Sequence, residues 1–127
     1  PVATGEHEWQ VPLGKGPTDH PAVAHLDLGD LGSVFSDVVA EGGVLVTKSL
    51  VISYLAAKDE IGPEETGSIL VAFDKTNGTK AGEVFVDQRL HGPIMSYQHD
   101  EIQYIAVAGG GRDNDAELLV FKLGNTP

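Results

Sequence analysis

The chain alternates between short apolar runs and polar or turn-forming residues, and no stretch has the period of an amphipathic helix. Apolar and polar residues alternate from His7 to Leu13 (HEWQVPL), which is the pattern of a half-buried strand. A run rich in β-branched residues follows at 43–55, and further strand-like runs follow at 68–74, 82–87, 93–98, 102–108 and 116–123. Short strands at this spacing predict an all-β sandwich, barrel or propeller.

Turn-forming residues separate these runs. Lys48-Ser49 divides the first long run into two strands joined by a tight hairpin. Asn77-Gly78 predicts another hairpin, because both residues tolerate positive φ. Gly62-Pro63 marks a loop within 56–67. Residues 14–42 are rich in Gly, Pro and Asp and predict a long loop, with a short helical turn near Leu31 to Val39.

An internal repeat favours the propeller among these architectures. Residues 44–74 and 94–123 each run as a strand, a tight turn, a strand, a polar Gly-containing loop and a closing strand. The closing strands, ILVAFD and LLVFKL, are alike. Self-similarity at roughly 50 residues is typical of propeller blades.

Charge and composition narrow the class of partner. The 19 acidic and 8 basic residues give a net charge of -11, which disfavours nucleic acid and anionic membranes as partners. The chain has no cysteine, so disulfides, thiolate metal sites and cysteine nucleophiles are excluded. No apolar run approaches the roughly 20 residues of a membrane span. The start at Pro1, without a leader pattern, indicates a processed or excised fragment.

Two segments resemble the tryptophan docking motif of quinoproteins. Thr4 to Trp9 (TGEHEW) resembles its Thr-Gly-Lys-x-x-Trp end, and Ala72 to Gly78 (AFDKTNG) resembles its beginning. In that motif the Asp-to-Gly stretch forms a hairpin and the Trp stacks between neighbouring blades. The second copy has Thr79 where Lys is usual and Gly82 where Trp is expected. We therefore expect the second stack to be missing or replaced by Phe85.

These motifs, followed in order by GGVLVTKSLVIS, GPIMSYQHDEIQYIAVAGGG and ELLVFKL, make the chain similar to the C-terminal end of pyrroloquinoline quinone (PQQ)-dependent, glucose-dehydrogenase-like dehydrogenases. The resemblance implies a partial β-propeller of about two four-stranded antiparallel blades. Residues 1–13 would be the outer strand of a preceding blade, 14–42 a long loop, 43–87 a complete blade, and 93–123 three strands of the final blade. The leading strand, or a neighbouring chain, is expected to pair with the open edge at 116–123, which would allow homo-oligomers.

The resemblance places the cofactor near the propeller axis, on the face that the loops between strands reach. Gly109, Gly110, Gly111 and Arg112 are the first candidate site, because glycines allow close approach and a guanidinium pairs with carboxylates. Some relatives carry a His in this loop, about where Gly111 stands here. His91 is the second candidate, as a proton carrier or at the substrate mouth. A flexible loop with a solvated Arg112, and an exposed His91 without a role, are the alternatives.

No catalytic residue or metal-ligand set is assigned. His20 and His25 lie in an acidic loop, but their spacing matches no known metal site, so we expect solvated side chains. Asp113 to Asp115 with Glu117 lacks the remaining positions of a calcium loop and predicts a polar turn.

Three functions stay open at this point. The first is a segment of an enzyme that oxidises a sugar or other alcohol. The parent would hold PQQ and calcium, whereas the fragment alone would bind neither and be inactive. Its partners would be the remaining blades and a small-molecule substrate, in the bacterial periplasm or outside the cell. The second is a non-catalytic propeller scaffold of the bacterial envelope. The third is an unrelated β-sandwich.

Overall fold

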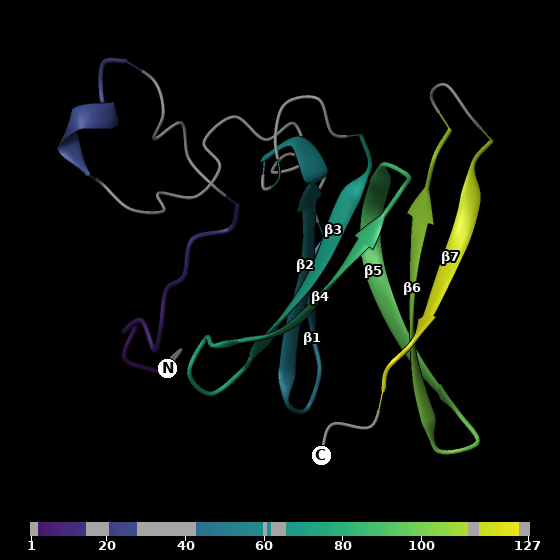
Figure 1. Cartoon of the computed structure of the whole chain (residues 1–127). Helices are drawn as coiled ribbons and strands as arrows, with labels where there is room; N and C mark the ends of the chain where they lie inside the picture. The colour runs from purple at the N-terminus through teal and green to yellow at the C-terminus, as the bar shows by residue number, and fades with distance from the viewer. Residues whose placement is uncertain are drawn as a thin grey trace.

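The computed structural model describes residues 3–14, 21–27, 43–59, 61, 66–111 and 115–124. It contains two antiparallel sheets (Figure 1). The first consists of β1 (Leu45–Val46), β2 (Leu50–Ala56), β3 (Ser68–Asp74) and β4 (Lys80–Val86), and the second of β5 (Leu90–His99), β6 (Ile102–Gly109) and β7 (Glu117–Lys122). Two short 3-10 turns, η1 (Ala24–Leu26) and η2 (Ala57–Asp59), are the described helical elements. The prediction of an all-β partial propeller is confirmed. The turn expected near Leu31 to Val39 lies outside the described residues.

Strands β2 and β3 are buried on both faces, as their nearly continuous apolar sequences require. Every residue of β2 pairs with β3, from Leu50 opposite Asp74 to Ala56 opposite Ser68. Successive side chains point to opposite faces of the sheet. Ile52 and Tyr54 therefore face the second sheet, and Leu55 faces the other way.

The two sheets pack through one apolar cluster. Its buried members are Ile52, Tyr54, Ala56, Leu70, Val86, Leu90, Ile94, Ile105 and Val107. Hydrogen bonds also cross the interface, among them one from the Tyr54 hydroxyl to the carbonyl of Gly92 (2.8 Å) and one from the Leu90 amide to the Ser68 hydroxyl (3.0 Å). A Cβ on Gly43 would lie 2.9 Å from the Gly92 carbonyl oxygen, so the start of the first sheet approaches β5 closely. The two sheets thus form one packed unit.

Between the two sheets, near the β1–β2 and β5–β6 turns, lies an open groove of about 1030 Å³, lined in part by Gly82, Val84 and Phe121. A Cβ on Gly82 would meet no atom within 4 Å. Phe85 pairs with Ile69, which faces away from the groove, and Phe85 itself is 50% exposed. The second tryptophan stack is therefore missing, and the alternative that Phe85 replaces it is wrong.

The leading segment, residues 3–14, forms no strand, so the strand predicted from His7 to Leu13 is wrong. The segment lies to the left of the four-stranded sheet in Figure 1, away from the three-stranded sheet. Its half-buried Trp9, Val11 and Leu13 pack on the outer cluster, which consists of Leu55, Ala57, Ile69, Val71 and Phe73. A strand forms only where a segment pairs with the free backbone edge of a sheet, and a segment that packs on a sheet face does not reach such an edge. The alternation of apolar and polar residues from His7 to Leu13 therefore serves side-chain packing alone.

The open edge of the second sheet has no strand beside it in the described part of the chain, where β7 pairs with β6 alone. The expectation that the leading segment folds back onto β7 is therefore wrong, because that segment packs on the other sheet. Pairing of this edge with a neighbouring chain stays a prediction.

The hairpin between β3 and β4 forms the docking surface for Trp9. The amide of Gly78 donates to the Asp74 carbonyl (2.9 Å), and the Asp74 amide donates to the Thr79 carbonyl (2.7 Å). Gly78 is buried with φ of 74°, and a Cβ there would lie 2.6 Å from Cε3 of Trp9. The indole Nε1 donates to the carbonyl of Lys75 (2.8 Å). Gly78 is thus required both by the turn and by the ring that rests on it.

We expect Trp9→Ala to lower the free energy of unfolding by about 2 kcal/mol, because it removes half-buried aromatic packing and one hydrogen bond. Gly78→Ala should also destabilise, and by less when Trp9 is already Ala, because the clash with the ring is then gone. Urea unfolding followed by far-UV circular dichroism measures these values. Gly82→Ala is the matched control and should change stability by about 0.5 kcal/mol or less. Equal costs of Gly78→Ala in both backgrounds would contradict the docking.

The turn carboxylate gives a pH-dependent prediction. Hydrogen bonds from the Thr76 hydroxyl and the Thr76 amide (2.8 Å) hold the pKa of the exposed Asp74 carboxyl below its ordinary value of 3.8. Because the pKa of Asp74 is lower in the folded than in the unfolded chain, the ionised carboxyl stabilises the fold at pH values above the unfolded pKa. This stabilisation is lost as the pH falls through the folded pKa. Thr76→Ala should raise the Asp74 pKa toward 3.8, and Thr76→Ser should not, in a carboxyl-carbon NMR titration.

Candidate functional site

Loops gather at one end of the two sheets. The C-terminal ends of β2, β4 and β6 lie at the upper end in Figure 1, and the hairpins β1–β2, β3–β4 and β5–β6 lie at the lower end. This follows from antiparallel order, because alternate connections leave opposite ends of a sheet. The candidate residues at 91 and 109–111 belong to the upper end, here called the loop end.

Gly109, Gly110 and Gly111 are not equivalent. The space of a Cβ on Gly109 is already occupied, by Leu119 Cδ1 at 2.8 Å and Gln88 Oε1 at 3.1 Å. Gly110 is buried at φ 77°, and its amide donates to the Arg89 carbonyl (2.9 Å). Gly111 is exposed at φ 93°. Only Gly111 of the three therefore presents open backbone to a ligand. Arg112 lies outside the described residues.

His91 holds this loop. Its Nε2 lies 2.7 Å from the carbonyl oxygen of Gly110, and the imidazole is half-buried. A carbonyl oxygen only accepts, so Nε2 carries the proton and donates it to this bond. The two candidate segments thus come together, which their separation in the sequence did not reveal. In this arrangement His91 is a positioning residue for the loop.

Sequence reasoning missed the polar pair beneath the glycines. The Gln88 side-chain amide nitrogen donates to Glu117 Oε2 (2.7 Å) and ties the β4–β5 connection to the start of β7. Gln88 Oε1 is buried and has no hydrogen-bond partner, and it faces Gly109. Nothing in the local sequence marks a glutamine in a connection as buried, so only the packing of the two connections could identify it.

The described residues do not make a cofactor or calcium cradle by themselves. Within the described ranges, no three His, Cys, Asp or Glu side chains cluster so as to hold a metal ion. The position at Gly109 is filled, and the Gly110 carbonyl is taken by His91. His20, Asp113 and Asn114 lie outside the described residues.

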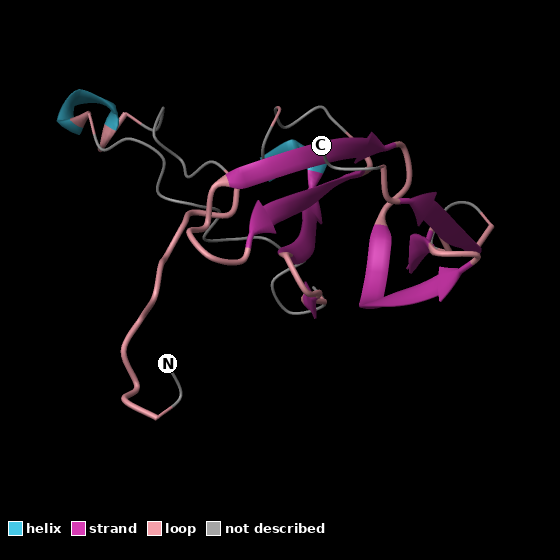
Figure 2. Cartoon of the chain, turned by 90° about the horizontal axis from the view of Figure 1, so that it is seen from below, coloured by secondary structure: helices cyan, strands magenta, loops and turns pink. Residues whose placement is uncertain are grey.

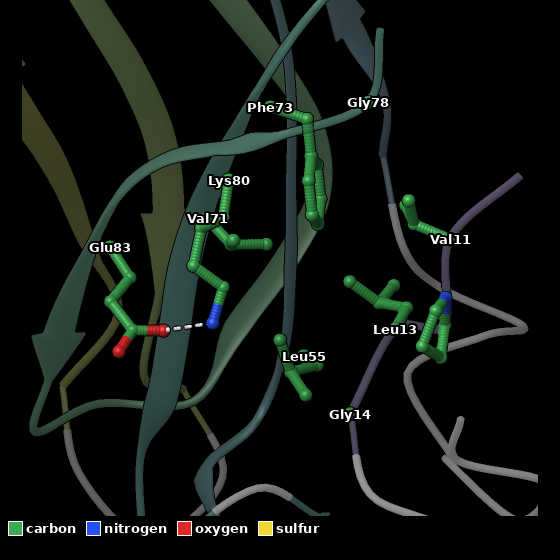
Figure 3. A pocket seen from close by; sticks show the side chains of 10 residues that line it. Val11, Leu13, Gly14, Leu55, Val71, Phe73, Gly78, Lys80 and Glu83 are labelled. Atoms are coloured by element: carbon green, nitrogen blue, oxygen red, sulfur yellow. Dashed lines mark hydrogen bonds and ion pairs between the residues drawn. The ribbon is translucent and has the colours of Figure 1, made fainter. Parts of the chain in front are cut away.

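A separate cavity of about 260 Å³ lies between the leading segment and the first sheet (Figure 3). Val11, Leu13, Leu55, Val71 and Phe73 give it an apolar wall, and an ion pair between Lys80 and Glu83 (3.0 Å) stands at one side. None of the candidate residues lines it. No helix in the described ranges has the length and apolar character to cross a membrane.

We expect His91→Ala to accelerate hydrogen exchange of the Gly110 and Gly111 amides about fivefold, because loss of one hydrogen bond costs about 1 kcal/mol. His91→Gln should restore most of the protection, since its amide nitrogen can donate from a similar position. Amide exchange followed by mass spectrometry measures both. His99→Ala is the control, because the His99 ring is 74% exposed and far from this loop in the β5–β6 register. Unchanged exchange in His91→Ala would refute the positioning role.

Comparison with known proteins gives one result. The family described as PQQ: Glucose/ethanol/alcohol dehydrogenase, beta-propeller domain, matches residues 1–105. The match ends within β6, so it covers Trp9, the docking hairpin and His91 but not Gly109 to Arg112. No curated protein and no solved structure gives a significant match. On the extent of the family match, with two antiparallel sheets packed as neighbouring blades, the chain belongs to the PQQ-type glucose/ethanol/alcohol dehydrogenase β-propeller family.

Proposed function

We propose that this chain is the C-terminal segment of a PQQ-dependent dehydrogenase that oxidises a sugar or another alcohol. It would contribute two blades and the loop end to a ring completed by the remaining blades of the parent. The family match over residues 1–105 carries the proposal. The docking of Trp9 on the Lys75–Gly78 turn supports it, because a ring of blades needs such contacts between neighbours.

When bound, PQQ supplies a two-electron oxidation, and the protein binds and orients the reactants. In the completed ring, exposed Gly111 would let the cofactor approach the backbone, and Arg112 would pair with one of its carboxylates. His91 would fix the loop through Gly110 and keep the Nε2 proton engaged. Calcium and the catalytic base would be held by blades outside this chain.

The isolated chain is proposed to be inactive. Its described residues offer one exposed glycine at the loop end and no carboxylate cluster for a metal. Most contacts to a planar tricarboxylate would have to come from other blades. The family also suggests a periplasmic or secreted location for the parent.

A second candidate, a non-catalytic scaffold of the bacterial envelope, is favoured by the filled loop end. Leu119 and Gln88 occupy the space beside Gly109, and His91 occupies the Gly110 carbonyl. A loop built by its own packing needs no ligand to explain its glycines. The same fold serves both roles, so the site and not the fold must decide.

The decisive experiment mixes the purified chain with PQQ, calcium and glucose or ethanol, and follows reduction of a dye. We expect no turnover, and no saturable change in PQQ absorbance up to about 1 mM, which corresponds to binding weaker than about 4 kcal/mol. Turnover by the isolated chain would refute the proposal that it is an inactive segment.

The complete reading frame separates the two candidates. Further blades upstream of Pro1 with Asn, Asp and Lys side chains on the axial face would support the enzyme. Upstream blades without these side chains would support the scaffold.

A further inference from the structure

The groove between the two sheets continues their packed interface but stays open. It lies near the β1–β2 and β5–β6 turns, at the end opposite to the loop end, and measures about 1030 Å³. Its wall includes side chains of the apolar cluster that joins the sheets, among them Ile52, Leu70, Ile105 and Phe121. Val84 pairs with Leu70 on this same side of the first sheet and is nevertheless 48% exposed. A largely apolar pocket of roughly this volume can hold a small organic ligand.

Gly82 is the reason that the groove is open. Ile52 pairs with Ala72, and Ala72 pairs with Gly82, so the side chains of this row become smaller toward the outer strand. A Cβ at Gly82 would meet no atom within 4 Å. The unfilled space therefore begins at β4 and extends toward the second sheet.

One wall of the groove repeats the surface on which Trp9 packs. That surface is the outer cluster of the first sheet, to which Phe73 of β3 belongs. Phe73 pairs with Val51 in the first sheet, and Phe121 pairs with Ile105 in the second. Phe121 lines the groove. The second sheet thus presents to the groove the same aromatic side chain that the first sheet presents to Trp9.

The hydrogen-bond acceptor for the ring is repeated as well. In the first sheet the Lys75 amide donates to the Ser49 carbonyl (2.9 Å), and the Lys75 carbonyl accepts the indole N–H of Trp9 (2.8 Å). In the second sheet the Leu123 amide donates in the same way to the Gln103 carbonyl (3.0 Å). Lys75 and Leu123 each follow the wall phenylalanine by two positions, and Leu123 lines the groove. The Leu123 carbonyl is therefore the counterpart of the Lys75 carbonyl.

From this correspondence we infer that the groove is a binding site for a neutral, flat aromatic molecule with one N–H donor, of about the size of indole. The ring packs on Phe121 beside Gly82, and its N–H donates to the Leu123 carbonyl. A charged ligand is disfavoured, because the wall that the cluster supplies is apolar. Further blades would pack on the outer faces of the two sheets, so this inference does not rest on the proposed function.

An NMR titration of the isotope-labelled full chain with indole tests the site. Shifts of the Gly82, Phe121 and Leu123 amides should saturate with a Kd of about 1 mM or tighter, as a ligand of this size allows. Benzofuran has the same two-ring shape without the N–H and should bind about fivefold more weakly, because one hydrogen bond is lost. Equal affinity for the two compounds would overturn the inference. Shifts that never saturate, or that are confined to Val11 and Leu13 beside the leading segment, would overturn it as well.

Gly82→Trp should weaken indole binding at least about tenfold, because the new ring fills the groove. Phe85→Trp is the matched control: Phe85 pairs with Ile69 and faces away from the groove, so the same ring added there should leave the Kd within about twofold. Circular dichroism checks that both variants keep the fold. Undiminished binding by a folded Gly82→Trp chain would contradict the site.

Trp9→Ala is the positive control, because it empties the surface from which the site is inferred. Indole should then also shift the Lys75 and Gly78 amides, which border the vacated position. Failure of indole to bind there would overturn the inference too, since the groove is assigned by its likeness to that surface.

Discussion

The burial of β2 and β3 on both faces is the constraint on which the rest of this structure depends. Their apolar side chains point alternately to two sides, and a single sheet cannot cover both. The three-stranded sheet covers one side through the Ile52–Tyr54 cluster. The leading segment covers the other, where Trp9 rests on Gly78 and donates to the Lys75 carbonyl. The described residues therefore form three layers, with the first sheet in the middle.

The same packing shapes the loop end. The sheets are held together at Tyr54–Gly92 and Ser68–Leu90, and the β4–β5 connection also contacts the residues on either side of the β6–β7 connection, through the Arg89 carbonyl to the Gly110 amide and through Gln88 to Glu117. Gln88 then fills the space at Gly109, and His91 reaches the Gly110 carbonyl. A glycine-rich sequence that suggests a ligand cradle is in large part a close contact between two connections, with Gly111 as its exposed member.

A stack of layers has two outer surfaces, and they differ. The leading segment ends the stack on one side and shields the first sheet with three apolar side chains. Nothing comparable covers the second sheet among the described residues, where Met95 and Leu118 stand exposed.

The sequence by itself determined the all-β class, the Lys48-Ser49 and Asn77-Gly78 hairpins and the missing second tryptophan, because alternation, turn propensity and residue type are local properties. It also placed His91 and Gly110 among the candidates. Only the tertiary structure decided that residues 7–13 pack without pairing, that Phe85 points away from the groove, and that His91 holds the Gly110 carbonyl. Those outcomes depend on contacts between backbone edges and side chains that are far apart in the sequence, and a local sequence pattern does not predict such contacts.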